Sequence, residues 1–396
     1  IGKLKNKILY FHHGGVRGGD PQSLIYLIEN LNENKYEPVI ACGYDEPYAR
    51  EFFENYGYDT INIPVARFYH FHHGYYKFYK PRSIRQFILW IINYLKSQKV
   101  FISKLKKIDP DIIHLNSLSI AHLAYIAKKM GFSVVLHVRE AAIKLHRFDI
   151  RWHWLKFLAT KYTDRIIYIC EDNQNKLTGK TKHSTIIYNP VPFDKFDRSI
   201  DGKAIREEFK IPLDSLVLFF PGGSGHEPKG IYPFLDSLNI LKEKYNNIKA
   251  IIPKLKGKTE ILNYINYLDL NDIILKLPFT NNVEKYYAAS DIVVAPFIVP
   301  HFSRAVIEAG AMAKPVIASE IGGIEEVVEN GKTGLLVNLN DYKDLASKIT
   351  KLTGNKELRT KIGLKSYKKS IKKYSSSNYA NMIMRLYQEI ATESKN

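Results

Sequence analysis

The sequence predicts an α/β protein with two doubly wound parallel-sheet domains. Three observations lead to this fold class. The length of 396 residues suits two domains of ordinary size. The strand-like segments are mostly apolar throughout, which is typical of parallel strands buried on both faces. Helical segments separate these strands, and the strand–helix pattern restarts after a proline-containing linker near residues 189–197.

The first domain is expected over residues 1–190. Its first strand is KILYF, and GGDPQSLIYLIENL then opens a helix, with Asp20 able to cap it and Pro21 suited to its first turn. One face of that helix is apolar. Further strands are expected in EPVIAC, DTINI, DIIHLN, SVVLHV, RIIYIC and STIIY.

The second domain is expected over residues 191–375, and the tail 376–396 is expected to pack back on the first. Strands are predicted in LVLFFP, IKAIIP, DIILKL, DIVVAP, KPVIA and GLLV. The tail has helical periodicity, with an apolar side of Tyr379, Met382, Ile383, Leu386, Tyr387 and Ile390. Two such Rossmann-like domains, face to face, would leave a cleft at the carboxyl ends of both sheets, where ligands bind in these folds.

Composition indicates a soluble globular protein, with 45% hydrophobic and 25% charged residues. The longest apolar run, Phe87–Leu95, is far short of the ~20 residues that span a bilayer. No signal peptide is visible. The two cysteines, Cys42 and Cys170, each end an apolar run, which favours buried reduced thiols in a cytoplasmic protein.

The formal charge of +18 indicates a partner with negative charge. From Ile61 to Ile108 there are ten Lys and Arg and no Asp or Glu. Two interpretations stay open: a solvated basic helix with a loop before it, or a surface that docks on anionic lipid through basic and aromatic side chains. The nearby His70, His72 and His73 suggest a metal only weakly, because no Cys or carboxylate accompanies them.

The loop GGSGHEPKG follows a strand and precedes a helix. Its amides and the helix N-terminus favour an anion, and Lys229 adds a full charge. More specific motifs do not fit: Pro228 stands where a dinucleotide fingerprint needs its third glycine, and Lys229 is followed by Gly230 rather than by Ser or Thr. A nucleophile elbow would need glycine at His226. By itself the loop is weak evidence, because most such loops are plain strand–helix turns.

The segment PHFSRAVIEAGAMAKPV predicts a helix that begins near Arg304 or Ala305. A positive helix end with Arg304 suits a diphosphate, and Glu308 one turn further suits two vicinal hydroxyls such as those of a ribose. The alternative is an ordinary surface Arg–Glu pair, which the apolar surroundings disfavour.

These two segments, with YYAASDIVVAPF, SEIGGIEEVVENGKTGLLV and IIYNPVPFDKF, resemble the family-4 retaining glycosyltransferases of GT-B fold. The resemblance runs from GGVRGGDPQSLIYLIENL to about Leu352. It implies a nucleotide-sugar donor, a UDP- or GDP-sugar, bound mainly by the second domain. The acceptor, a glycan or a lipid-linked glycan, would be bound mainly by the first.

Residue by residue, Lys229 matches the family's phosphate-binding lysine and Glu308 the second glutamate of its Glu-seven-residues-Glu motif. Phe302 and Ser303 match the tight loop whose amides face the donor. Gly18 and Gly19 match the glycine pair near the phosphates. The donor-binding residues expected from this comparison are Gly18, Gly19, Gly223, Ser224, Lys229, Phe279, His301, Phe302, Ser303, Arg304 and Glu308.

The sequence departs from the family pattern at three places. The first glutamate of the motif falls on Pro300, and the usual phosphate arginine falls on Ser224. The catalytic His-Asp pair falls on Arg139 and Glu140, with His137 two residues earlier. Arg304 is expected to replace the missing arginine, and His301 or Ser303 to take over sugar contact. The expected catalytic residues are Lys229, Arg304, His137, Arg139 and Glu140.

The resemblance therefore predicts a cytoplasmic, peripherally membrane-associated enzyme of surface polysaccharide or glycolipid assembly. Residues 61–108 would contact the membrane, and no metal or cofactor is expected. Two alternatives remain: a sugar-nucleotide epimerase of the same fold, which would release free nucleotide, and a nucleic-acid-binding protein, which would bind with steep salt dependence.

Overall fold

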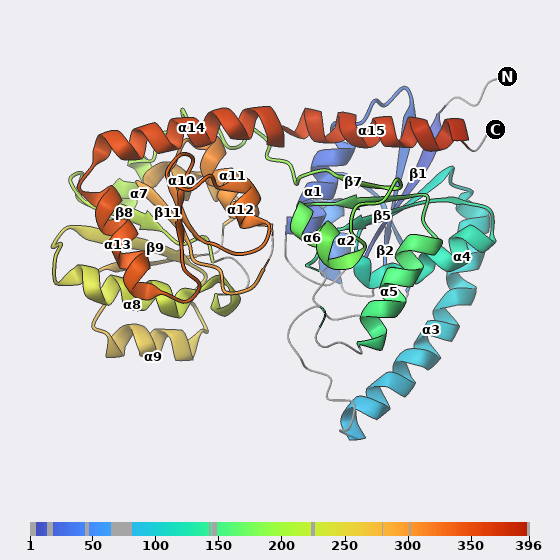
Figure 1. Ribbon diagram of the computed structural model, residues 1–396, viewed down its shortest axis with the longest axis horizontal. Helices are drawn as coiled ribbons and strands as arrows, with labels where there is room; N and C mark the ends of the chain where they lie inside the picture. Colours follow the sequence, from blue (N-terminus) through green and yellow to red (C-terminus); the bar gives the residue numbers. More distant parts are fainter. Residues whose placement is uncertain are drawn as a thin grey trace. The chain divides into compact units, whose positions relative to one another are not determined.

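The computed structural model describes residues 5–13, 19–43, 47–64, 81–141, 144, 149–222, 226–278, 280–300 and 302–393. The chain divides into two compact units (Figure 1). The first consists of Ile1–Asn189 with Ser376–Asn396, and the second of Pro190–Ser375. Each unit is an α/β layer structure around a parallel sheet, as the sequence predicts.

The first unit contains a seven-stranded sheet in the order β3-β2-β1-β4-β5-β6-β7. Its strands are β1 Asn6–His12, β2 Tyr36–Cys42, β3 Thr60–Asn62, β4 Ile112–Leu115, β5 Ser133–Val138, β6 Arg165–Tyr168 and β7 Ser184–Ile186. Its α-helices are α1 Gly19–Ile28, α2 Pro47–Glu54, α3 Pro81–Ile108, α4 Leu123–Lys129, α5 Ile150–Lys161, α6 Glu171–Leu177 and α15 Ser376–Glu393. All neighbouring strands pair in parallel.

Both faces of the central part of this sheet are buried, which explains why its inner strands are largely apolar. In β1, Leu9 and Phe11 enter one hydrophobic cluster with residues of α3, α4 and α5. Ile8 and Tyr10 point to the other face and join a cluster with residues of α1 and α15. Alternate residues of a strand point to opposite faces, so a continuous apolar strand fills both layers.

The C-terminal helix α15 packs beside α1 in the first unit (Figure 1). Five of the six residues predicted for its apolar side are buried: Tyr379, Ile383, Leu386, Tyr387 and Ile390. The prediction for Met382 is wrong, because its side chain is 37% exposed. Met382 lies at the edge of the apolar arc, where helical periodicity alone does not separate a buried position from an exposed one.

The second unit contains a six-stranded parallel sheet in the order β10-β9-β8-β11-β12-β13. Its strands are β8 Leu216–Phe219, β9 Ile248–Pro253, β10 Ile274–Leu277, β11 Ile292–Ala295, β12 Val316–Ser319 and β13 Leu335–Val337. Its α-helices are α7 Lys203–Glu208, α8 Ile231–Lys242, α9 Thr259–Tyr267, α10 Glu284–Ala289, α11 Arg304–Ala311, α12 Ile324–Val327, α13 Tyr342–Thr353 and α14 Lys356–Tyr374. A 3₁₀ turn, η2, spans Glu227–Lys229.

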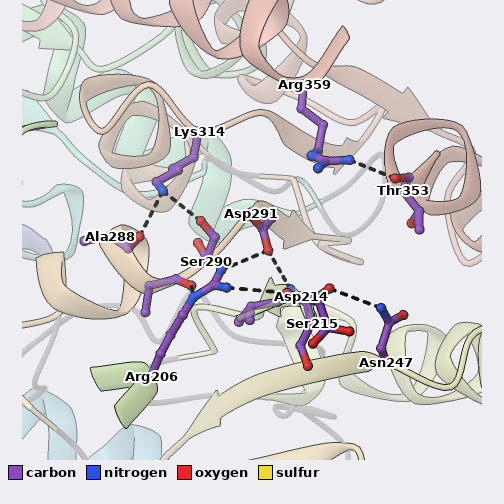
Figure 2. A network of polar contacts seen from close by, with 12 residues as sticks. Arg206, Asp214, Ser215, Asn247, Ala288, Ser290, Asp291, Lys314, Thr353 and Arg359 are labelled. Carbon is purple, nitrogen blue, oxygen red and sulfur yellow. Dashed lines mark hydrogen bonds and ion pairs between the residues drawn. The ribbon is translucent and has the colours of Figure 1, made fainter. Parts of the chain in front are cut away.

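A polar network holds the amino ends of the central strands of this sheet (Figure 2). Arg206 of α7 donates to Asp291 Oδ2 at 3.0 Å and to the main-chain oxygen of Ala289. Lys314 donates to the main-chain oxygens of Ala288 and Ser290. These groups satisfy loop carbonyls that would otherwise be buried without a partner. The carboxyl ends of the same strands lie at the opposite edge of the sheet, where ligands bind in such folds.

Candidate active site

The loop that leads to Lys229 connects β8 to α8 and is fixed against the loop after β11. Gly230 ends the 3₁₀ turn with a φ of 79°, in the left-handed region that favours glycine. A β-carbon at Gly230 would collide with the main-chain oxygen of Pro296. The amide of Ile298 also donates to the oxygen of Pro228 at 3.0 Å. These contacts place Lys229 beside Phe297, whose ring centroid is 6.0 Å from the Lys229 Nζ.

His226 anchors the start of this loop, and the sequence reasoning did not identify that role. Its ring is buried, hydrogen-bonds through Nε2 to the main-chain oxygen of Pro253 at 2.9 Å, and stacks on Phe220 at 6.3 Å. Burial lowers the pKa of His226, and nearby lysines lower it further, so the imidazole stays neutral. The sequence feature that could have indicated this role is the position of His226 directly after the glycine-rich part of the loop.

Helix α11 carries the second part of the site. It begins at Arg304, as predicted, after the buried Phe302 and the N-cap residue Ser303. The Ser303 side chain makes no capping hydrogen bond. The ring of Phe302 packs against Tyr374 at 6.2 Å. The packing of Phe302 fixes the loop at the N-terminus of α11.

Arg304 and Glu308 form an ion pair, with Arg304 Nη2 2.9 Å from Glu308 Oε1. Their side chains are 16% and 11% exposed, so the pair is not an ordinary surface pair. The hydroxyl of Tyr287 reaches the other carboxylate oxygen, Glu308 Oε2, at 3.0 Å. The Glu308 carboxylate is therefore held from both sides.

Lys229 belongs to the same charged group. Burial lowers the pKa of Lys229 to about 8, with Glu308 opposing that shift and Arg304 adding to it. The structure thus brings together Lys229, Arg304 and Glu308, which lie far apart in the sequence. Two cationic side chains and one carboxylate provide positive charge for an anionic ligand and acceptors for hydroxyl groups.

The first unit carries a second group of polar residues at the carboxyl ends of its strands. Ligand atoms of His13, Asp20 and Glu140 all lie within 4.8 Å of one another. The amide of Leu118 donates to Glu140 Oε2 at 3.1 Å, and the Ser117 hydroxyl donates to Oε1. Burial raises the pKa of Glu140 to about 7, Asp20 raises it as well, and the two hydrogen bonds oppose the shift.

The helix α1 beside this group begins two residues earlier than the capping prediction implies. It starts at Gly19, so Asp20 lies within the first turn rather than before it. An acidic side chain there still favours the positive helix end. It also places the Asp20 carboxylate beside Glu140.

His137 and Arg139 lie in the interior of the first unit rather than at its surface. Both are buried, at 0% and 5% exposure. The Arg139 guanidinium donates to Asn116 at 2.6 Å, Asn189 at 2.9 Å and Tyr379 at 2.8 Å. Arg139 therefore links Asn116, which follows β4, to Asn189 at the end of the first stretch of this unit and to Tyr379 of α15. This geometry favours a structural role for Arg139 over the predicted catalytic one.

His137 is part of a buried row of hydrogen-bonded histidine and tyrosine side chains. Its Nδ1 lies 3.2 Å from His114 Nε2, and His114 Nδ1 lies 2.6 Å from the Tyr387 hydroxyl, which donates to Tyr10. Burial lowers the pKa of His137 well below its usual value, and Arg139 lowers it further. A neutral imidazole in the core is suited to holding α15, not to exchanging protons with a substrate.

Several predicted positions lie outside the described residues. They are the donor-binding candidates Gly18, Gly223, Ser224, Phe279 and His301, and residues 65–80 of the basic stretch, including its histidines. Their predicted roles stay predictions.

Most of the described part of the basic stretch is helix α3, and this helix presents apolar side chains to solvent. Ile88, Ile91, Ile92 and Leu95 are 51%, 37%, 42% and 57% exposed. Their spacing of three and four residues puts them on one face of the helix. Within the described ranges, no helix combines the length and apolar character needed to cross a bilayer.

Two family models match the chain, one in each half. The model described as "Glycosyltransferase Family 4" matches residues 17–195, and the model described as "Glycosyl transferases group 1" matches residues 201–369. The chain therefore belongs to the family-4 glycosyltransferases of GT-B fold and is a transferase.

The chain is also similar to individual glycosyltransferases in sequence, and to a solved structure in fold. The chain is similar to the capsular polysaccharide biosynthesis glycosyltransferase CapM of Staphylococcus aureus, at 28% identity over 52% of this chain and 54% of the relative. It is also similar to the UDP-Gal:alpha-D-GlcNAc-diphosphoundecaprenol alpha-1,3-galactosyltransferase of Escherichia coli, at 26% identity over 67% of this chain and 73% of the relative. The crystal structure of Anabaena Alr3699/HepE in complex with UDP has the same fold, with a TM-score of 0.81, 17% identity and coverage of 97% of this chain and 100% of that chain.

Proposed function

We propose that this glycosyltransferase moves a sugar from a UDP- or GDP-sugar to a hydroxyl of a glycan or lipid-linked acceptor, with retention of configuration. The observation that carries the proposal is the group of Lys229, Arg304 and Glu308 in the second unit. The Escherichia coli relative is named for a UDP-Gal donor and a diphosphoundecaprenol acceptor, and the CapM relative for capsular polysaccharide. Those names support assembly of a surface polysaccharide or glycolipid.

The second unit supplies the groups that a leaving nucleoside diphosphate requires. Negative charge grows on the phosphates as the sugar departs, and we expect Lys229, Arg304 and the N-terminus of α11 to stabilise it. Such fixed charges often make the largest contribution to catalysis. Because two cationic side chains supply this charge, we expect the reaction to need no metal.

The first unit supplies a candidate for proton transfer. With retention of configuration, the leaving phosphate lies on the face of the sugar that the acceptor attacks and can accept the acceptor's proton. Glu140, whose pKa is raised to about 7, is a second group that could hold that proton near neutral pH. Of the expected first-unit catalytic residues, Glu140 is the one whose surroundings suit the role.

The test is ligand binding by wild type and one variant. In a thermal-shift panel of UDP, GDP and ADP, at least one nucleotide should raise the Tm, because a ligand stabilises the state that it binds. Glu308→Ala should weaken that nucleotide by about 1.5–3 kcal/mol if a charged hydrogen bond to ribose is lost. Glu243→Ala, at an exposed position beyond α8, is the matched control. No binding, or equal binding by the Glu308 variant, would contradict the donor site.

An epimerase of the same fold would give the same binding result but a different product. It would release free nucleotide from the sugar nucleotide with water as the acceptor. Incubation with the identified donor, with and without a glycan acceptor, separates the two activities. Nucleotide release that requires the acceptor supports the transferase.

We propose further that the protein works at an anionic membrane surface in the cytoplasm, where lipid-linked acceptors are available. Helix α3 supports this, because Ile88, Ile91, Ile92 and Leu95 are exposed on one face. Its C-terminal part also carries several lysines: Lys96, Lys99, Lys104, Lys106 and Lys107. A helix with both features binds at the headgroup boundary. The sequence showed the basic charge of this region, and the structure adds an exposed apolar face to it.

A further inference from the structure

Tyr287 lies behind the Glu308 carboxylate, on helix α10. It is fully buried, and its ring packs edge-on against Phe219 of β8 at 4.8 Å and against Phe196 at 5.9 Å. Its hydroxyl lies 3.0 Å from Glu308 Oε2 and 3.2 Å from the main-chain oxygen of Ala305. A rigid ring thus directs one hydroxyl at one carboxylate.

The single proton of that hydroxyl goes chiefly to Glu308. A tyrosine has one O–H donor, whereas two oxygens lie within reach. The carboxylate is the closer acceptor and is charged, and hydrogen bonds to charged groups are the stronger ones. Burial and the charge of Glu308 raise the pKa of Tyr287 well above its usual value, so the hydroxyl remains a donor across the working pH range.

Counting acceptor sites shows what is left on Glu308. A carboxylate has about four lone-pair positions, two on each oxygen. Arg304 uses one on Oε1, and Tyr287 uses one on Oε2. Counting only the residues that the structure describes, one position on each oxygen remains, which matches the two donors of a vicinal diol.

We propose that Tyr287 is a positioning residue for donor recognition: together with Arg304 it fixes the Glu308 carboxylate so that both oxygens receive the two ribose hydroxyls of the nucleotide. The proposal rests on the donor site described above and adds a residue to it. Without the Tyr287 hydroxyl, Arg304 is the remaining partner of the carboxylate among the described residues, and the carboxylate can rotate away from the diol. The predicted loss therefore concerns the ribose and not the phosphates.

The experiment compares Tyr287→Phe with wild type on two ligands. The variant keeps the ring and its packing against Phe219, so the fold is retained. With UDP, or whichever nucleoside diphosphate the wild type binds, calorimetry should show a Kd roughly tenfold weaker. With the 2′,3′-dideoxy form of the same nucleotide, wild type and variant should bind equally. The matched control is Tyr264→Phe, which removes another tyrosine–carboxylate bond of the second unit, to Asp236 at 2.6 Å.

A double variant gives an independent check. Because Tyr287 acts through Glu308, Tyr287→Phe should cause no further loss of affinity in a Glu308→Gln background. Equal loss on both ligands, or full additivity with Glu308→Gln, would show a general structural role and overturn the inference alone. A wild-type protein that binds none of UDP, GDP and ADP would overturn the proposed donor site and this inference with it.

Discussion

Arg304 and Glu308 stand one helical turn apart at the start of α11 and form a largely buried ion pair with an N–O distance of 2.9 Å. A pair at this spacing on a helix surface contributes only about 0.2–0.5 kcal/mol. Removing both charges from water costs more than such a pair usually returns. Stability alone is therefore a poor explanation for it. Ligand binding would explain both charges, because a diphosphate would contact Arg304 and a ribose would contact Glu308.

The pKa of Lys229 predicts how nucleotide affinity depends on pH. Free Lys229 loses its proton as the pH rises through about 8, and a diphosphate binds better to the protonated form. Affinity should therefore be highest below pH 8 and fall above it, with uptake of a proton on binding. Calorimetry in buffers of different ionisation enthalpy, from about pH 7, where phosphates are largely ionised, to pH 9, measures both effects. A Lys229→Ala variant should show neither, and a pH-independent wild type would contradict this role.

Lys229 should act more on turnover than on donor affinity. Charge on the diphosphate grows as the glycosidic bond breaks, so a fixed cation stabilises the transition state more than the bound donor. Lys229→Ala should lower kcat by about a hundredfold or more, while donor Kd changes less. Lys244→Ala, at an exposed position of the same unit, is the control. Rates that fall only through a raised KM would count against the assignment.

Sequence reasoning found the sheets because their strands carry a strong local signal. All thirteen predicted strands are present, from KILYF in β1 to GLLV in β13, and the central ones are apolar enough to fill both faces of their sheets. The start of α11 at Arg304 was also predictable, since the loop residues before it cannot continue a helix. Local pattern therefore determined the fold class and the start of α11.

The partners of the site residues were not predictable, because they depend on contacts between distant segments. Tyr287 lies 21 positions from Glu308, and nothing near Tyr287 in the sequence indicates the carboxylate that it meets. Arg139 and His137 were matched to catalytic positions by their place after a strand. Only the tertiary structure shows that their side chains point into the core toward α15. Their positions in the sequence correctly placed both residues near the carboxyl end of β5, but did not indicate where their side chains point.

Gly230 should be intolerant of a side chain. Its φ is 79°, and a β-carbon would collide with the main-chain oxygen of Pro296, so Gly230→Ala must move the loop that carries Lys229. We expect a loss of stability of on the order of 1–3 kcal/mol, with a clear loss of nucleotide binding. Gly257→Ala is the control, because Gly257 also has a positive φ of 80° but has open space around its β-carbon position. Denaturant unfolding together with the thermal-shift panel measures both losses, and a Gly230 variant that behaves like the control would refute the close-contact argument.

Asp20 should control the pH at which Glu140 ionises. Burial and Asp20 raise the pKa of Glu140 to about 7, so activity that needs ionised Glu140 is lost as the pH falls through that value. Asp20→Asn removes the neighbouring charge, and the acid limb of the kcat profile should move to lower pH. Asp172→Asn, in a surface ion pair with Lys176, should leave it unchanged. A chelator should not alter either profile, and a chelator-sensitive wild type would instead indicate a cation at His13, Asp20 and Glu140.

The apolar face of α3 should bind the protein to anionic membranes. Ile88, Ile92 and Leu95 are each at least 42% exposed, and burying each in the interface would contribute up to about 1.5–3 kcal/mol. The triple change of these residues to serine should release the protein from vesicles that contain anionic lipid, while nucleotide binding is unchanged. Leu213→Ser, at a position 79% exposed in the second unit, is the control for loss of surface apolarity.

The basic residues of the same region should act through charge and should therefore depend on salt. Each contributes about 1 kcal/mol near an anionic surface, and screening weakens exposed charges at high ionic strength. The sequence-based variant that neutralises Lys77, Lys80, Arg82 and Arg85 should lose binding at low salt, as the wild type does at high salt. The serine variant should lose membrane binding at both low and high salt, because it lacks the apolar contacts and their contribution does not depend on salt. Co-sedimentation with anionic and neutral liposomes at two salt concentrations separates these contributions. If wild type and both variants sediment equally, or none sediments, α3 is a solvated face and the membrane is not its partner.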